Sequence, residues 1–200
     1  MASLEEIRST RLAKLRLLEE RGINPYPAST ARDISNKDAA EKFEEGKMLT
    51  MAGRIMSLRA QGKIIFFDFD DGTGRFQALL KKSEPLPEEQ FELFEQAFDI
   101  GDFAEVRGTL FLTKNGQKTI LAEEVKMLSK SLLPLPEKWH GLQDVEERFR
   151  KRYLDTLSNP EVKERFIRRS KVIELIREFY LKKGFIEVDL PNLQPLAGGA

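Results

Sequence analysis

Apolar positions near the start of the chain recur at the spacing of a helix. One stripe carries Leu4, Ile7, Leu12, Leu15 and Leu18. This pattern predicts an amphipathic helix over residues 4–21. Ser3 and Glu6 have the spacing of a capping box, in which each side chain accepts a hydrogen bond from the other residue's backbone N–H. Gly22 and Pro25 should end the helix, because glycine suits a C-cap and proline cannot continue a helix.

The same helical pattern returns near the end of the chain over a longer stretch. Its stripe carries Phe166, Val172, Ile173, Leu175, Ile176, Phe179 and Tyr180. Gly184 stands where a left-handed C-cap would close the helix, and residues 185–190 then read as a short strand before Pro191. A lone helix and strand cannot bury so wide a stripe. We therefore expect it to need a partner chain or a larger domain beyond residue 200.

Between these helices the pattern changes to alternation, which is typical of strands. Strand-like runs cover residues 48–60, 63–70, 75–81, 103–113 and 118–128, with turn signals at Asp71-Gly-Thr-Gly74 and Asn115-Gly116. A helical segment over residues 88–98 separates the third strand from the fourth, and a short helix near residues 36–45 precedes the first. Five strands with a helix between the third and fourth is the element order of an OB-fold barrel.

Proline-containing segments suggest the domain boundaries. Leu132-Leu-Pro-Leu-Pro136 reads as a stiff linker, and Asn159-Pro160 restarts the chain before the last helix. The predicted fold is α+β and mainly β. Its parts are an N-terminal helical extension (1–46), an OB-fold domain (47–131), an interdomain linker (132–158) and the first helix and strand of a further domain (159–200).

Composition excludes several kinds of site. The chain has no cysteine and one histidine, which argues against disulfides, thiolate metal sites and histidine-based zinc sites. Its 33 basic residues balance 33 acidic ones, so it lacks the broad basic field of non-specific nucleic-acid binding but retains room for a focused site. No apolar run approaches the roughly 20 residues of a membrane span, and the charged N-terminus is no signal peptide. We expect a cytoplasmic protein with no membrane partner.

Strand periodicity predicts which side chains point outward from the barrel and which point into its core. Phe66, Gln77 and Glu124 should point outward from the second, third and fifth strands. The inner face should hold Ile65, Phe67, Phe69, Phe76, Ala78, Leu80, Leu121, Val125 and Met127. A ring with a neighbouring amide and carboxylate could stack on a base and bond its edges, as single-strand recognition requires. The alternative is a surface phenylalanine covered by the N-terminal helix, with two solvated polar residues.

Two other patterns have structural interpretations. Asp71-Gly-Thr-Gly74 lacks the third glycine or the Gly-Lys-Ser/Thr of a phosphate loop, so it predicts a turn. Asp68, Asp70 and Asp71 lack the spacing of a calcium loop, so they predict a polar strand face rather than a metal site.

Several short blocks occur in a fixed order along the whole chain. They are Gly22-Ile-Asn-Pro-Tyr-Pro27, Gly53-Arg-Ile55, Arg59, Gly62-Lys63, Phe66, Asp71, Gly74, Gln77, His140-Gly-Leu-Gln-Asp144, Arg152-Tyr-Leu-Asp155 and Gly198-Gly-Ala200. Together they resemble the class II lysyl-tRNA synthetases, and the last helix, strand and Pro191 are similar to motif 1 of that class. Aspartyl- and asparaginyl-tRNA synthetases share the barrel and motif 1 but not the blocks at 23–27 and 140–144, which favours lysine.

The resemblance implies roles for individual residues. Phe66 would stack on an anticodon base, preferably the central uridine, and Gln77 and Glu124 would bond the edges of that base. Arg54 and Arg59 would hold phosphates or flank the bases, with salt bridging as the alternative for both.

The resemblance also implies an assembly and a reaction for the whole enzyme. Phe179 and Pro191 would belong to a homodimer interface, and Gly198, Gly199 and Ala200 would line an incomplete lysine pocket. The basic run of Arg148, Arg150, Lys151 and Arg152 would make interdomain salt bridges or contact tRNA.

The full enzyme would activate lysine with ATP and Mg²⁺ and esterify the 3′ end of its tRNA. The chain lacks motifs 2 and 3 of this class. We therefore expect no catalytic residue, no cofactor and no activity in this fragment. Asp68-Phe-Asp-Asp71 departs from the family pattern and adds negative charge near the RNA face. Two other hypotheses are a stand-alone tRNA-binding module and an OB domain that binds protein.

Overall fold

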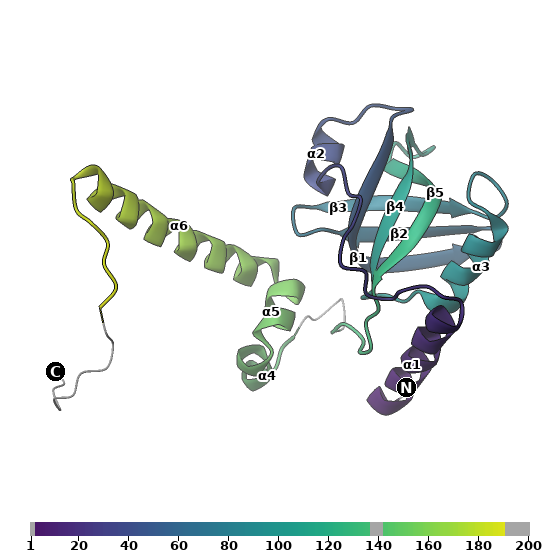
Figure 1. Ribbon diagram of the computed structural model, residues 1–200, viewed down its shortest axis with the longest axis horizontal. Helices are drawn as coiled ribbons and strands as arrows, with labels where there is room; N and C mark the ends of the chain where they lie inside the picture. Colours follow the sequence, from purple (N-terminus) through teal and green to yellow (C-terminus); the bar gives the residue numbers. More distant parts are fainter. Residues whose placement is uncertain (1–2, 137–141, 191–200) are drawn as a thin grey trace. The chain divides into compact units, whose positions relative to one another are not determined.

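The structure is a computed structural model that describes residues 3–136 and 142–190 (Figure 1). The chain divides into two compact units, residues 1–135 and 136–200, and each is described by itself. The first unit holds a five-stranded barrel and the second holds helices. None of the helices within the described ranges combines the length and the apolar content needed to cross a membrane.

The first helix, α1 (Leu4–Glu20), begins at the predicted capping box. Ser3 Oγ accepts a hydrogen bond from the Glu6 N–H at 3.2 Å, and Glu6 Oε2 accepts one from the Ser3 N–H at 2.7 Å. Gly22 follows the helix with φ +70°, a conformation that glycine adopts without steric cost. The predicted N-terminal helix is confirmed.

The second helix, α2 (Asn36–Glu41), is shorter than the predicted one over residues 36–45. It begins at Ser35, whose side chain accepts a hydrogen bond from the Asp38 N–H. The chain then leaves the helix and turns at Gly46, which has φ +84° and donates its N–H to the Leu110 carbonyl. In a helix that continued to this point the Gly46 N–H would bond the carbonyl four residues earlier, so its bond to a distant strand is incompatible with helix at Gly46.

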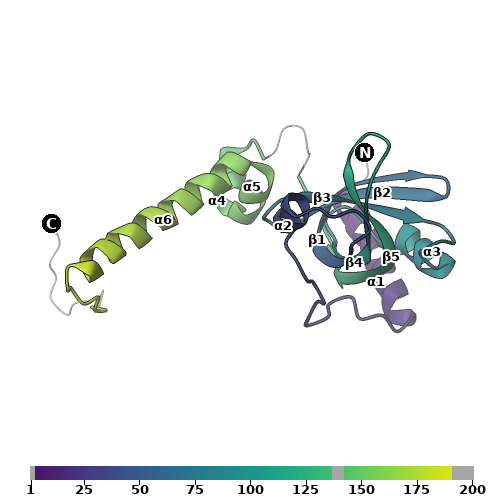
Figure 2. The ribbon, with the colours of Figure 1, turned by 90° about the horizontal axis from the view of Figure 1, so that it is seen from above.

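Five strands form a closed barrel in the order β1-β2-β3-β5-β4. Their bounds are β1 (Met48–Gln61), β2 (Ile64–Asp70), β3 (Arg75–Lys81), β4 (Phe103–Leu112) and β5 (Lys118–Ser129). Long β1 pairs with both β2 and β4, and β3 closes the ring by pairing in parallel with β5. The predicted OB-fold barrel is confirmed, and Figure 2 shows its strands from above.

Apolar side chains fill the barrel, and α3 (Glu88–Ala97) covers one of its ends. Phe67 and Phe69 are fully buried, as predicted for the inner face of β2. Phe94 of α3 stacks on Phe67 with ring centroids 5.1 Å apart, so the helix continues the barrel core. The buried Ala39 of α2 belongs to the same core, and Figures 1 and 2 show α2 and α3 at different ends of the barrel.

The prediction for the inner face of β5 is wrong at Leu121. Arg107 of β4 pairs with Glu124, but Gly108 pairs with Ala122, which leaves Glu123 as the extra residue of a β-bulge. The bulge reverses the alternation, so Ile120 and Ala122 are buried while Leu121 lies outside. Met127 lies beyond the bulge and is buried, as predicted.

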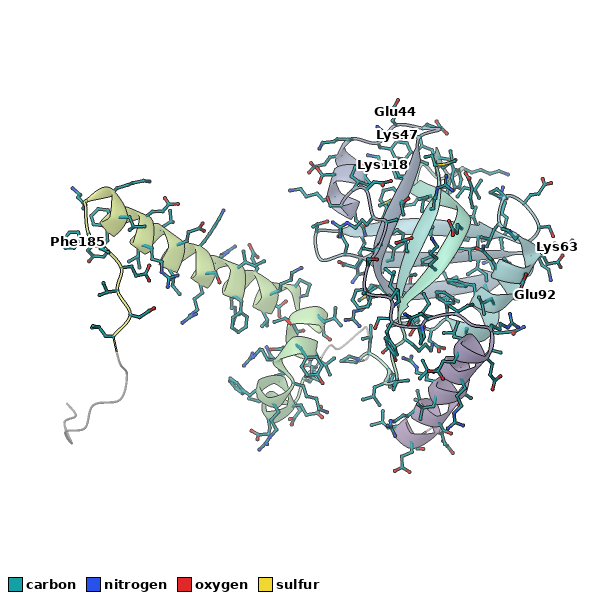
Figure 3. All side chains as sticks on the ribbon, viewed as in Figure 1. Glu44, Lys47, Lys63, Glu92, Lys118 and Phe185 are labelled. Carbon is teal, nitrogen blue, oxygen red and sulfur yellow. The ribbon has the colours of Figure 1, made fainter. Side chains whose placement is uncertain are left out.

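The second unit contains α4 (Val145–Arg150), α5 (Arg152–Ser158) and α6 (Pro160–Lys182), so two helices lie in the segment predicted as a linker. Gly184 follows α6 with φ +85°, as expected of a left-handed cap. The strand predicted over residues 185–190 is wrong, because these residues pair with no strand in the described part of the chain. Figure 3 shows Phe185 just beyond the end of α6.

Candidate nucleic-acid interface

Two rows of side chains cross the outer surface of β1, β2, β3 and β5, and we call this surface the outer face. Strand register aligns the first row as Ser57, Asp68, Gln77 and Thr119, and the second as Arg59, Phe66, Leu79 and Leu121. The rows are about 7 Å apart, since next-but-one residues on a strand are separated by two rises of about 3.3 Å. One nucleotide base could therefore contact both rows.

Phe66 is the aromatic residue of this face. It is half-buried, and its ring stacks on no other ring among the residues that the structure describes. Its cross-strand partner Leu79 is buried and apolar. Phe66 thus offers a supported ring that a base could stack on.

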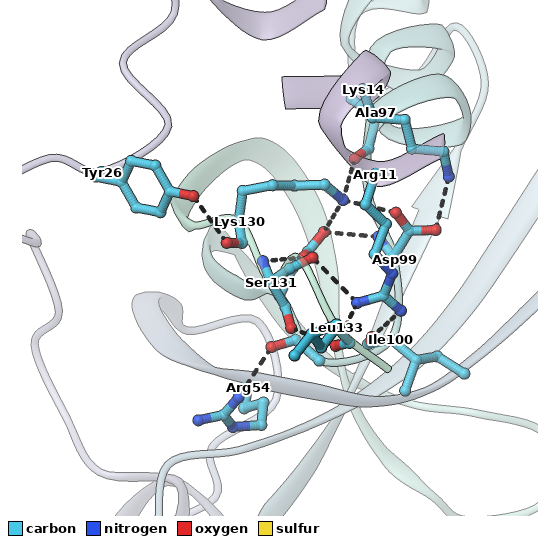
Figure 4. A network of polar contacts seen from close by, with 12 residues as sticks. Arg11, Lys14, Tyr26, Arg54, Ala97, Asp99, Ile100, Lys130, Ser131 and Leu133 are labelled. Atoms are coloured by element: carbon cyan, nitrogen blue, oxygen red, sulfur yellow. Dashed lines mark hydrogen bonds and ion pairs between the residues drawn. The ribbon is translucent and has the colours of Figure 1, made fainter. Parts of the chain in front are cut away.

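The N-terminal helix, which was the alternative candidate to cover Phe66, packs against other parts of the first unit. In α1, Arg11 donates to the carbonyls of Ile100, Ser131 and Leu133, and Lys14 bonds Asp99 (Figure 4). The same helix packs on α3. These contacts hold α1 against α3 and the chain around residues 99–133, not against β2.

Arg59 lies directly beside Phe66 in the register of β1 and β2. Its side chain is exposed and makes no ion pair within residues 3–136 and 142–190. A free guanidinium beside a free ring can bind a phosphate or stack on a base. Salt bridging, the alternative role for this residue, is not observed there.

Gln77 points outward as predicted but is not solvated. Only 9% of its surface is exposed, and its Oε1 accepts a hydrogen bond from the Thr119 hydroxyl at 2.9 Å. Across the strand, Asp68 accepts a hydrogen bond from the Ser57 hydroxyl through Oδ2. Thr119 could not be identified from the sequence, because its contact with Gln77 joins two residues that are 42 positions apart on different strands.

Arg54 lies away from these two rows. It precedes Arg59 by five positions on β1, a separation of roughly 16 Å at about 3.3 Å per residue. Its guanidinium stacks over the Phe103 ring at 4.3 Å and donates to the Gly101 carbonyl at 3.1 Å. Burial lowers the pKa of Arg54, and the Asp102 carboxylate only partly opposes this shift. The side chain is therefore engaged in contacts within the barrel.

Glu124 is also separated from Gln77. Gln77 pairs with Thr119, and Glu124 lies five residues further along β5, roughly 16 Å away at about 3.3 Å per residue. Its carboxylate is 3.1 Å from Lys126, and it lines a different cavity with Thr30 and Gln90. A single base could not reach both Gln77 and Glu124, so the structure does not bring these two predicted residues together.

The acidic residues after β2 serve the local structure. Asp71 accepts hydrogen bonds from the N–H groups of Asn36, Thr73 and Gly74, and its carboxylate is 3.3 Å from Arg32. This network links the β2–β3 turn to the start of α2, which confirms the predicted turn. Across the described ranges, no three acidic or histidine side chains are arranged to hold a metal ion.

The basic run in the second unit is paired within that unit. Asp155 has a fully buried carboxylate that bonds Arg148 at 2.9 Å and Arg152 at 2.7 Å. Arg150 and Lys151 pair with acidic residues one helical turn away. Each of these four basic side chains therefore has an acidic partner within the second unit.

The remaining predicted residues lie on α6 or outside the described residues. Phe179 is 57% exposed within an apolar stripe of α6 that no other described residue of the second unit covers. His140 and Gly141 of the 140–144 block lie outside the described residues, as do Pro191, Gly198, Gly199 and Ala200.

Two family models match the chain. Residues 49–128 match the OB-fold nucleic acid binding domain, which corresponds to the barrel and its outer face. Residues 144–200 match the class II tRNA synthetases of the D, K and N type. With this pair of domains in this order, the chain belongs to the class II aminoacyl-tRNA synthetase family.

The chain is similar along nearly its whole length to curated lysine–tRNA ligases. It is 46% identical to one from Dehalococcoides mccartyi over 204 residues, covering 98% of this chain and 41% of that protein. It is 46% identical to lysine–tRNA ligase 2 of Methanosarcina mazei over 96% of this chain and 38% of that protein. The Thermotoga maritima enzyme is 42% identical over 98% of this chain and 41% of its own length. The chain thus spans about 40% of the length of these relatives.

Proposed function

We propose that the whole protein is a lysine–tRNA ligase and that the barrel of this chain binds the anticodon loop of its tRNA. The relatives named above support lysine as the amino acid. The observation that supports anticodon binding is the free ring of Phe66 beside Gln77, whose amide Thr119 holds in place on the outer face of an OB-fold. A free ring and a fixed amide are the groups that reading an unpaired base requires.

Each residue of the outer face has a separate part in this proposal. Phe66 stacks on the central base of the anticodon, a contact that is worth about 1–3 kcal/mol for an aromatic ring in single-strand binding. Gln77 bonds the edge of that base, and Arg59 binds a neighbouring phosphate. Arg54 and Glu124 are not part of the base site, because of their positions and their partners within the barrel.

The proposal for the rest of the reaction concerns the whole protein. It activates lysine with ATP, requires Mg²⁺ and works in the cytoplasm as a homodimer. The exposed stripe of α6 with Phe179 supports the dimer, since an apolar face of this kind is typical of an interface. The described residues include no group of three or more acidic or histidine side chains that could hold a metal ion such as Mg²⁺. We therefore assign no chemical step to them.

The test is fluorescence anisotropy of this chain with a labelled anticodon stem–loop of lysine tRNA. Wild type should bind, and Phe66→Ala should weaken binding about tenfold or more, the scale of one lost stacking contact. Glu124→Gln is the matched control on the same barrel and should leave the affinity unchanged. Equal affinity of wild type and Phe66→Ala would contradict the proposed site.

A further inference from the structure

The hydrogen bond between Thr119 and Gln77 has consequences for which base the outer face accepts. A glutamine amide can offer either its carbonyl or its N–H groups, so it discriminates between bases only when something fixes its orientation. Thr119 is fully buried, and its hydroxyl is 2.9 Å from Gln77 Oε1. This bond directs Gln77 Oε1 toward Thr119 inside the protein, so the N–H groups of the amide are left to face a ligand.

Asp68 favours the same orientation of the amide. It is the direct cross-strand neighbour of Gln77, and side chains so placed have Cβ atoms about 4.5–5.5 Å apart. A reversed amide would set Gln77 Oε1 beside the Asp68 carboxylate, which would bring two acceptors together. The other acceptor near the Thr119 hydroxyl, the Gln117 carbonyl, is further away at 3.1 Å.

Asp68 itself presents an acceptor of fixed orientation. The Ser57 hydroxyl occupies its Oδ2, and Oδ1 accepts no hydrogen bond from any residue that the structure describes. The outer face therefore carries an N–H donor on Gln77 and a carboxylate acceptor on Asp68. Both lie in the row next to that of Phe66, about 7 Å away. This pair complements a base edge on which a carbonyl oxygen lies next to a ring N–H.

We propose that Thr119 and Asp68 determine the base selectivity of the outer face. Thr119 is a positioning residue that holds Gln77 as a donor to a base carbonyl, and Asp68 accepts the adjacent ring N–H. Uracil and guanine carry this combination of groups. Cytosine stacked in the same pose would set its amino group against the N–H of Gln77 and its unprotonated ring nitrogen against the Asp68 carboxylate. This inference rests on the proposed anticodon function and extends it to two further residues.

The experiment compares two stem–loops that differ only in a central uridine or cytidine, which have similar stacking area. We expect wild type to bind the uridine loop about tenfold more tightly or better, since the wrong base leaves buried polar groups unpaired. Thr119→Val keeps the size of the side chain but removes the hydroxyl, so the amide can reverse and the preference should fall to about twofold or less. Thr119→Ser keeps a hydroxyl and should retain the preference.

Asp68→Asn provides a second, independent variant. Its carbonyl would take the Ser57 hydrogen bond and its amino group would face the base, so the preference for uridine should also fall. Thr30→Val is the matched control, because the Thr30 hydroxyl donates to Glu105, whose partner Lys126 lies toward the opposite end of β5 from Thr119. It should leave the preference unchanged, and thermal melts of all variants check that each one folds.

The outcomes separate the inference from the proposed function. A wild-type preference for uridine that survives both Thr119→Val and Asp68→Asn would overturn the inference and leave the anticodon site intact. A wild type that binds neither loop, or binds both equally, would contradict base reading and overturn both. A wild-type preference for cytidine would show that Gln77 presents its carbonyl and would overturn the inference alone.

Discussion

Lys130 and Asp102 form an ion pair whose two side chains are both fully buried, with 2.7 Å between Nζ and Oδ2. Lys130 Nζ also bonds Asp99 at 2.6 Å and the Ala97 carbonyl at 2.8 Å (Figure 4). Burial opposes ionisation of both carboxylates. At Asp99 the hydrogen bonds from Lys130 and Lys14 outweigh burial, so the pKa of Asp99 is lowered. At Asp102 burial outweighs the bond from Lys130, so the pKa of Asp102 is raised. The cluster joins the end of β5 to the connection before β4, where α1 is also held.

Replacing Lys130 should be strongly destabilising. Lys130→Met leaves a buried carboxylate without its cation, which costs about 3–5 kcal/mol in comparable buried pairs. Urea unfolding followed by circular dichroism measures the loss. The control is Lys47→Met, which breaks the exposed Lys47–Glu44 pair and should change stability by less than about 1 kcal/mol (Figure 3). Equal losses in the two variants would contradict a structural role for the buried cluster.

Acid should destabilise the first unit in part through Asp71. Burial raises the pKa of Asp71, but hydrogen bonds from Thr73, Asn36 and Gly74 lower it by more than burial raises it. The net pKa therefore lies below the ordinary value of 3.8. Because the folded pKa is the lower one, the stabilisation is complete above 3.8 and is lost as the pH falls below it. Asp71→Asn should be less stable than wild type at pH 7, and the two should converge at the acidic end of a denaturant series. A constant gap between them at every pH would refute the prediction.

Gly108 should not tolerate a side chain. A Cβ at this position would lie 1.9 Å from the backbone oxygen of Leu121, so Gly108→Ala must displace the bulge. We expect a loss of about 2–4 kcal/mol, in the range of severe steric substitutions. Gly74→Ala is the control, because its Cβ would meet no atom closer than 3.8 Å. Thermal melts of the two variants should differ clearly, and similar melting temperatures would contradict the prediction.

The exposed stripe of α6 should make the chain self-associate. Leu175 is 61% exposed and Phe179 is 57% exposed, on an apolar surface that no other described residue of the second unit covers. Analytical ultracentrifugation should detect association of wild type that weakens in Leu175→Asp and Phe179→Asp. Glu174→Lys changes charge on the same helix and should have little effect. A wild type that stays monomeric at all concentrations would argue against this interface.

Most of the elements could be predicted from the sequence, because local patterns specify them. Strand alternation and the glycine turns place all five strands within one residue of their predicted bounds, and the capping box at Ser3 places the start of α1. The outward position of Phe66 follows from the same alternation, since Phe67 on the next position is fully buried. The strand predicted over residues 185–190 failed, because a strand also requires a neighbour and no local pattern supplies one.

The sequence by itself determined the elements and one aromatic residue of the candidate site, whereas only the tertiary structure decided how the site is assembled. The bulge opposite Gly108, which sets Leu121 outside, depends on pairing between two strands and cannot be read from either one. The contact of Thr119 with Gln77 and the separation of Glu124 follow from the parallel pairing that closes the barrel. The physical reason is that alternation defines a face within a strand, while register between strands decides which side chains meet.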